Sequence, residues 1–86
     1  MFFAYVLQST VAARRYVGSA TDVVQREGQH NAGLCKSTKP WRPWRLVHQE
    51  AFESRAEAMR RERYLKTGKG REELDRILRV NGSSVR

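Results

Sequence analysis

Two short stretches of sequence decide the fold of this chain: Phe2-Phe3-Ala4-Tyr5-Val6-Leu7 and Arg15-Tyr16-Val17-Gly18. Both are rich in aromatic and β-branched residues and are bounded by polar or small residues, which is typical of β-strands. The residues between them are also polar or small. The sequence therefore predicts a β-hairpin whose loop runs over residues 10–13.

The register of this hairpin decides where its two tyrosines point. With the loop at 10–13, Leu7 lies opposite Tyr16, and Tyr5 lies opposite Gly18. Residues directly opposite each other share a face of the sheet, as do residues two apart on one strand. Both phenols then lie on one face as diagonal neighbours, and we expect Gly18 to leave open space beside Tyr5. A loop of odd length without a bulge would separate the phenols.

The composition indicates one small, basic domain. The chain has 86 residues, and we expect a single domain over residues 1–82 with a short tail at 83–86. The formal net charge of +8 favours a polyanionic partner, with nucleic acid first and an anionic membrane surface second. No apolar run is long enough to cross a membrane. A lone cysteine, Cys35, cannot form an internal disulfide, which favours a reduced, cytoplasmic setting.

The remainder of the chain predicts a small α+β fold. The expected elements after the hairpin are a helix at 22–31, a strand at 45–50, a helix at 54–66 and a last helix ending at 81–82. Asp22 and Ser54 are good N-caps, and we expect Gly68 and Gly70 to break the chain before the last helix. The order β-β-α-β-α-α favours a three-stranded, mostly antiparallel sheet flanked by helices.

The helix at 22–31 presents two candidate functional side chains on one face. Val23, Arg26 and His30 are spaced i, i+3 and i+7 and therefore lie together. Arginine offers a forked, permanently charged donor suited to phosphate, and a histidine one turn away could shuttle a proton or contact phosphate. Taken singly, such residues are more often structural. We interpret His48 as structural, and we set aside Cys35 as a nucleophile because no orienting group accompanies it.

The helix at 54–66 carries an acidic residue on its apolar face. Ala58, Met59 and Leu65 predict that face, and Glu62 falls in its middle. A carboxylate there is costly unless it is paired, hydrogen-bonded or bound to a metal. Either Glu62 pairs with an arginine of the same helix, or it is a ligand for a divalent cation. Magnesium keeps several waters, so one glutamate can suffice.

A basic, aromatic loop precedes the third strand. Its cations can meet phosphates, and its indole rings can stack on unpaired bases. The alternative is that the tryptophans pack over the sheet, and we expect one of them to do so. The residues of this loop are Lys36, Lys39, Trp41, Arg42, Trp44 and Arg45. The pattern does not separate DNA from RNA.

Taken together, these residues resemble the GIY-YIG nuclease family, in particular its small stand-alone bacterial members. The likeness extends to the catalytic domains of an excinuclease component and of homing endonucleases. It covers roughly residues 3–79 and is carried by Tyr5-Val6-Leu7, Tyr16-Val17-Gly18 followed by Ser19-Ala20-Thr21-Asp22, Arg26, His30-Asn31-Ala32-Gly33, residues 39–47, and Glu57-Ala58 ahead of Glu62. The first motif lacks the family's glycine and isoleucine, and Gln25 stands where a second basic residue is frequent.

The resemblance implies an endonuclease that hydrolyses DNA with Mg²⁺ or Mn²⁺, selecting structure rather than sequence, with a role such as DNA repair. It implies catalytic roles for Tyr5, Tyr16, Arg26, His30 and Glu62, with Glu62 as the metal ligand. One tyrosine would be the base and the other a positioning group, and we favour Tyr5 as base. Expected nucleic-acid contacts are Gly18, Lys36, Lys39, Trp41, Arg42 and Arg45. The rival hypothesis is a non-catalytic module that binds nucleic acid and keeps the fold.

Overall fold

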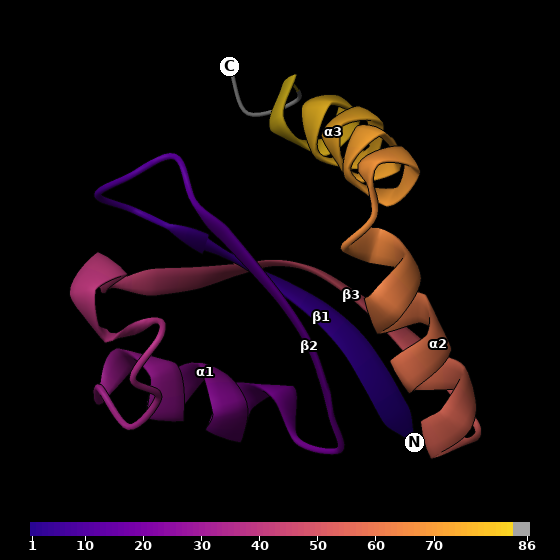
Figure 1. Cartoon of the computed structure of the whole chain (residues 1–86), viewed down its shortest axis with the longest axis horizontal. Helices are drawn as coiled ribbons and strands as arrows, with labels where there is room; N and C mark the ends of the chain where they lie inside the picture. The colour runs from indigo at the N-terminus through magenta and orange to yellow at the C-terminus, as the bar shows by residue number, and fades with distance from the viewer. Residues whose placement is uncertain (84–86) are drawn as a thin grey trace.

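The computed structural model describes residues 1–83, with side chains described through residue 79. Within these residues, three strands and three α-helices follow one another in the order β-β-α-β-α-α (Figure 1). One short 3₁₀ turn lies between the first helix and the third strand. The elements are β1 (Phe2–Ser9), β2 (Arg15–Ala20), α1 (Val23–Asn31), η1 (Lys39–Trp41), β3 (Trp44–Phe52), α2 (Arg55–Leu65) and α3 (Gly68–Ser83). The predicted α+β class and element order are confirmed. No helix within residues 1–83 is both long and apolar enough to span a bilayer.

The strands form an antiparallel sheet in the order β2-β1-β3, so the first strand of the chain is its centre. In the hairpin, Tyr5 pairs with Gly18 and Leu7 pairs with Tyr16, which confirms the predicted register. The backbone N–H of Ser9 donates to the carbonyl oxygen of Arg14 at 2.9 Å and closes the loop. Strand β3 is longer at both ends than predicted.

The two faces of the sheet are covered by different helices. On one face, α1 packs with Val23 against Tyr5, Leu7 and Trp44. On the other face, Leu65 of α2 and Leu74 of α3 pack against Val6 and Val17. Figure 1 shows α1 on one side of the strands and the α2–α3 pair on the other. Alternating side chains of β1 and β2 thus contribute to two separate cores.

The predicted helix starts are confirmed by their capping contacts. Asp22 Oδ1 accepts a hydrogen bond from the backbone N–H of Gln25 at 2.9 Å. Ser54 Oγ accepts from the N–H of Glu57 at 3.2 Å. Each cap satisfies a backbone donor that the first helical turn leaves without an intrahelical acceptor. These polar caps place both helices where the local sequence predicts.

Three expectations for the second half of the chain are wrong. Gly70 does not break the chain but lies inside α3, because its missing side chain lets α3 approach α2. A Cβ at this position would lie only 2.0 Å from the carbonyl oxygen of Tyr64. Met59 is 40% exposed, so the apolar face of α2 consists of Ala58 and Leu65. Helix α3 ends at Ser83 and not at 81–82, while residues 84–86 of the expected tail lie outside the described residues.

Candidate active site

The two tyrosines lie side by side on the α1 face of the sheet. Their ring centroids are 6.2 Å apart, as the diagonal relation in the hairpin predicts. Tyr5, on the central strand, is fully buried, whereas Tyr16, on the edge strand, keeps part of its surface exposed. Only Tyr16 therefore presents its ring to solvent, and the two phenols differ in what they can contact.

Gly18 does not provide the open space that the sequence predicts. The glycine is itself buried. A Cβ built there would lie 2.7 Å from the hydroxyl oxygen of Tyr5 and 3.0 Å from Cε2 of Tyr16. The space that the missing side chain leaves is already filled by the phenol of Tyr5. Gly18 therefore makes room for the tyrosine pair, and its buried position gives no surface for a nucleic acid.

His30 of α1 lies between the phenols and a buried threonine. Its ring centroid is 4.6 Å from that of Tyr16, and its Nε2 is 3.3 Å from the hydroxyl oxygen of Tyr5. On the other side, Nδ1 is 2.8 Å from Oγ1 of Thr38. The side chain is 1% exposed. His30 is thus held from both ring nitrogens, as expected for a histidine whose orientation is fixed.

Counting protons assigns the direction of these hydrogen bonds. The hydroxyl of Thr38 has one proton, which it donates to the carbonyl oxygen of Cys35 at 3.2 Å. Its oxygen must then accept from Nδ1–H of His30. A neutral imidazole has its other nitrogen free as an acceptor. The hydroxyl of Tyr5 therefore donates to Nε2 of His30. Thr38 is a member of this network that the sequence analysis missed.

Burial and Arg26 set the protonation of this network. Burial lowers the pKa of His30 below its ordinary value, and the charge of Arg26 lowers it further. The imidazole is therefore neutral near pH 7, in agreement with its accepting role. Burial raises the pKa of Tyr5, although the neighbouring Arg26 opposes this shift. The resting arrangement is a neutral phenol bonded to a neutral imidazole.

Arg26 reaches the phenols from α1, on the same face as His30. It lies close enough to Tyr5 that the hydroxyl raises the pKa of the guanidinium, and Tyr16 contributes to the same shift. Its Nε is shielded from solvent, and nothing in residues 1–83 accepts a hydrogen bond from it. A buried donor without an acceptor is costly. Tyr5, Tyr16, Arg26 and His30 are thus brought together.

Glu62 approaches from the opposite face of the edge strand. Its Oε1 accepts from the hydroxyl of Ser19 on β2 at 2.8 Å, and its Oε2 accepts from Nζ of Lys66 at 2.8 Å. Burial raises the pKa of this carboxyl, but the hydrogen bonds from Lys66 and Ser19 outweigh it, and the net shift is downward. The carboxylate is therefore ionised at neutral pH. Its partners are a lysine and a serine, not the arginine considered above.

Glu62 is separated from the phenols by β2 but remains within electrostatic range of them. Its negative charge is one of the causes that raise the pKa of Tyr5. Its side chain is 20% exposed. No group of three or more acidic, histidine or cysteine side chains within residues 1–83 could enclose a metal. A single ionised, accessible carboxylate fits a Mg²⁺ ion that keeps most of its waters. The 51% exposed side chain of Lys66 can move aside for it.

The side chains of the basic, aromatic loop differ in whether they are exposed or are bonded within the fold. Lys36, Lys39 and Arg45 are exposed, but Arg42 folds back, and its Nε donates to the carbonyl oxygen of Lys39 at 2.9 Å. Trp44 is buried, and its Nε1 donates to the carbonyl oxygen of Thr38 at 2.8 Å. One tryptophan therefore packs over the sheet, as predicted.

Trp41, the other indole, is partly buried against the same core. The guanidinium of Arg14 lies over its ring, 4.0 Å from the centroid. That arginine therefore covers one of the two ring faces that could stack on a base. His48, interpreted as structural, bonds to Glu50 Oε2 at 2.8 Å in a cluster with Arg61, so it is occupied within the fold.

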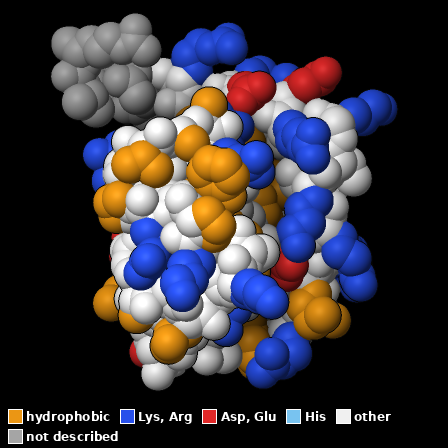
Figure 2. Space-filling model, turned by 60° about the vertical axis from the view of Figure 1, so that its left-hand side comes forward, with side chains coloured by type: hydrophobic (Ala, Val, Ile, Leu, Met, Phe, Trp, Pro, Cys, Tyr) orange, Lys and Arg blue, Asp and Glu red, His pale blue; other side chains and the backbone are white. Residues whose placement is uncertain are grey.

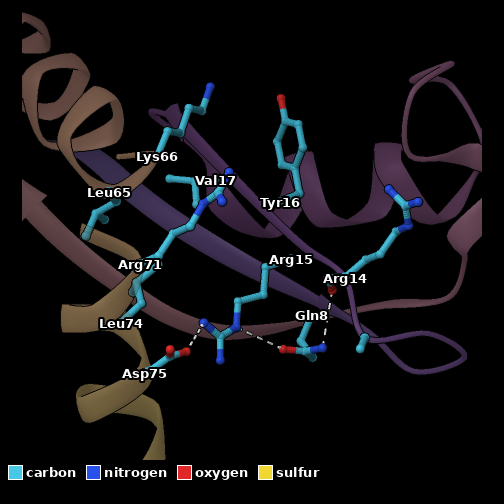
Figure 3. Close-up of a pocket in the computed structure, with 11 residues that line it drawn as sticks. Gln8, Arg14, Arg15, Tyr16, Val17, Leu65, Lys66, Arg71, Leu74 and Asp75 are labelled. Carbon is cyan, nitrogen blue, oxygen red and sulfur yellow. Dashed lines mark hydrogen bonds and ion pairs between the residues drawn. The ribbon is translucent and has the colours of Figure 1, made fainter. Parts of the chain in front are cut away.

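A basic groove runs beside the tyrosines, and the sequence analysis missed it. It has a volume of about 890 Å³ and is lined by Gln8, Ala13, Arg14, Arg15, Tyr16, Val17, Leu65, Lys66, Arg71, Leu74 and Asp75 (Figure 3). The space-filling view shows that basic side chains outnumber acidic ones on the visible face (Figure 2). The adjacent pair Arg14-Arg15 just before Tyr16 was a signal for it in the sequence. We call these lining residues the hairpin groove.

Comparison with known families identifies the class of protein. The family model of the GIY-YIG catalytic domain matches residues 1–75. The chain therefore belongs to the GIY-YIG family, a family of nucleases. This match confirms the resemblance drawn from the motifs.

Several proteins similar to this chain are members of a group of small bacterial proteins. A UPF0213 protein of Listeria monocytogenes serotype 4b (strain F2365) is 48% identical over 61 residues, which cover 70% of this chain and 67% of that protein. One from Staphylococcus haemolyticus (strain JCSC1435) is 48% identical over 63 residues, covering 72% and 77%. The solution NMR structure of a UPF0213 protein from Bacillus halodurans matches with a TM-score of 0.53 and 34% identity, covering 90% and 85%. The names of these proteins state no activity.

Proposed function

We propose that this chain is a divalent-metal-dependent endonuclease that hydrolyses phosphodiester bonds of DNA in the cytoplasm. The observation that carries the proposal is the convergence of Tyr5, Tyr16, Arg26 and His30 on one face, with the ionised Glu62 across β2 and within electrostatic range. We further propose that the chain selects DNA structure, such as flaps or branches, and acts in DNA repair.

We assign a separate role to each of these residues, and for the two tyrosines the role follows from their exposure to solvent. Arg26 is assigned to the phosphate, because its guanidinium is permanently charged and lies beside both phenols. Tyr16 is the phenol that reaches solvent, so we assign to it the attacking water, and not to Tyr5, which we favoured from the sequence. Tyr5 is fully buried and holds the position of His30. Proton transfer through such positioned groups typically accelerates reactions about 10²–10⁴-fold.

Glu62 is assigned to the metal. When bound, a divalent cation would polarise a phosphoryl oxygen and stabilise the leaving oxygen. Ser19 holds one carboxylate oxygen in place, and the downward pKa shift keeps the group charged. Lys66 bonds to the other carboxylate oxygen, so it would have to release Glu62 before a cation bound there, and the affinity for Mg²⁺ would depend on this lysine.

The test is cleavage of duplex, flap and branched DNA in Mg²⁺ or Mn²⁺ by wild type and by Glu62→Gln. We expect the variant to lose at least about 100-fold in rate, the size of effect seen when one charge-stabilising group is removed. The matched control is Glu57→Gln, which removes an exposed carboxylate from the same helix and should leave the rate unchanged. Equal cleavage by wild type and Glu62→Gln, or no cleavage of any structure, contradicts the proposal.

The contact between Lys66 and Glu62 favours a second candidate function, a module that binds nucleic acid without cleaving it. The ammonium already neutralises the carboxylate that a metal would need. This alternative expects salt-sensitive binding and no response to Mg²⁺ that depends on Glu62. Titration of Mg²⁺ into wild type and Glu62→Gln, followed by tyrosine fluorescence or NMR, separates the two functions without requiring turnover.

A further inference from the structure

We propose that the hairpin groove binds the sugar–phosphate backbone of a single DNA strand and leads it to Tyr16. The identity of the ligand as DNA rests on the proposed function, whereas the assignment of this surface rests on its charge and shape. Both can be measured without cleavage.

The charge of the groove is strongly positive. Four of its lining side chains are cationic, namely Arg14, Arg15, Lys66 and Arg71, and a single acid, Asp75, accompanies them. Asp75 is occupied by Arg15 at 2.7 Å. No ion pair within residues 1–83 holds Arg14 or Arg71. Neither guanidinium is neutralised by a carboxylate there, although Arg14 also lies over the ring of Trp41, and arginine is suited to phosphate geometry.

The cations stand on both walls of the groove. Arg14 and Arg15 come from the hairpin, at the start of β2, whereas Lys66 and Arg71 come from the end of α2 and the first turns of α3. Val17, Leu65 and Leu74 form the apolar surface between them. A strand lying in the groove would have its phosphates flanked from two sides and its sugars and bases over apolar atoms. Nonspecific single-strand sites combine the same features.

The size of the groove favours one strand over a duplex. Its volume of about 890 Å³ lies within the roughly 300–1,000 Å³ that clefts for small ligands enclose. A short piece of single strand matches that scale. The groove also ends at the candidate active site, because Tyr16 and Lys66 both line it, and Lys66 bonds to Glu62. Figure 3 shows the Tyr16 hydroxyl and the Lys66 amine pointing to the same side.

The test compares two pairs of cations in binding of a labelled single-stranded oligonucleotide by fluorescence anisotropy. The groove variant is Arg14→Gln with Arg71→Gln, and the matched control, the helix variant, is Arg60→Gln with Lys69→Gln at positions of α2 and α3 that do not line the groove. Measurements are made with EDTA over a range of salt concentrations, so no cleavage occurs. All four side chains are exposed, and circular dichroism checks that both variants keep the fold.

We expect the groove variant to bind at least about tenfold more weakly at low salt, and its salt slope to fall by about 1.4. That change corresponds to two phosphate contacts on a single strand. The helix variant should change the affinity less than about threefold. Arg14→Lys with Arg71→Lys should restore the slope, because it restores the charges. An unchanged slope in the groove variant, or an equal loss in the helix variant, overturns the proposal. A chain that binds through the groove but never cleaves would contradict only the nuclease activity.

Discussion

The two faces of the sheet are built from different chemistry. Beneath α1 the core contains hydrogen-bonded polar groups, with the Tyr5 hydroxyl, His30 and Thr38 linked in a chain. Beneath α2 and α3 the core is aliphatic, with Leu65 and Leu74 against the two strands. Aliphatic packing contributes stability without orienting reactive groups, whereas a satisfied polar network fixes orientation. The comparison teaches that the α1 face carries the phenols, Arg26 and His30, whereas the α2–α3 face supplies aliphatic packing and contributes Glu62 at the edge strand.

The largest expected effect on stability comes from the aliphatic face. Leu65→Ala removes a fully buried side chain and should lower the free energy of unfolding by about 2–5 kcal/mol, as large-to-small core substitutions do. Urea denaturation measures it. The control Val24→Ala changes a residue that is 76% exposed and should have little effect. A loss from Leu65→Ala below that from Tyr5→Phe would reverse the comparison.

The next largest effect on stability is expected at Gly18. This residue lies on the α1 face of the sheet, which carries Tyr5 and Tyr16 and which we call the phenol face. Gly18→Ala places a Cβ 2.7 Å from the Tyr5 hydroxyl oxygen, and such overpacking typically costs about 1–3 kcal/mol. It should also displace the phenol and reduce the proposed cleavage. Gly28→Ala is the matched control, because a Cβ added at Gly28 would meet no atom within 4 Å. Being in a helix, it should instead stabilise by up to about 1 kcal/mol. Equal stability changes in the two variants would show that Gly18 is not tightly packed.

Tyr5→Phe sharpens the comparison by removing one atom. The ring stays packed, and the hydroxyl loses its hydrogen bond to Nε2 of His30 and its contact with Arg26. A typical hydrogen bond contributes about 0.5–1.5 kcal/mol, so thermal or urea denaturation should show a small loss. The proposed cleavage should fall by more than this energy explains. An activity that follows the folded fraction alone would mean that the hydroxyl serves only stability.

The smallest effect is a pH dependence that belongs to the phenol face. The folded pKa of His30 lies below its ordinary value of 6.5 because of burial and Arg26. The unfolded chain therefore binds a proton at this site more readily than the folded chain. Stability from this residue is complete above about pH 6.5 and is lost as the pH falls from there through the lower folded pKa. Urea denaturation from mildly alkaline to mildly acidic pH should show the decrease, and His30→Asn should lack that contribution.

The sequence could predict the features that depend on local patterns. The hairpin register followed from loop length and strand alternation, and the caps at Asp22 and Ser54 followed from residue type. Those patterns also placed Tyr5, Tyr16 and the face of α1 together. The predictions that are wrong concern features that depend on how elements distant in the sequence pack together. Gly70 is required by the approach of α3 to α2, which no local signal encodes.

The candidate site shows the same division. The exposure of the two phenols, the role of Thr38 and the hairpin groove all arise from contacts across the fold. Arg71 meets the hairpin groove only because α3 turns back toward the hairpin, so its place among the cations has no signature in the flanking residues. The loop cations were visible in the sequence, but the structure folds Arg42 onto its own backbone.

The central position of β1 has a consequence for any change at the start of the chain. Terminal residues usually tolerate trimming, but here Phe2 pairs with Phe52, and Phe3 pairs with both Ala20 and Ala51. Deleting residues 1–3 would shorten two ladders at once in the middle of the sheet. A tag joined there meets the interior strand directly, so the opposite end of the polypeptide is the safer place for a label or an affinity handle.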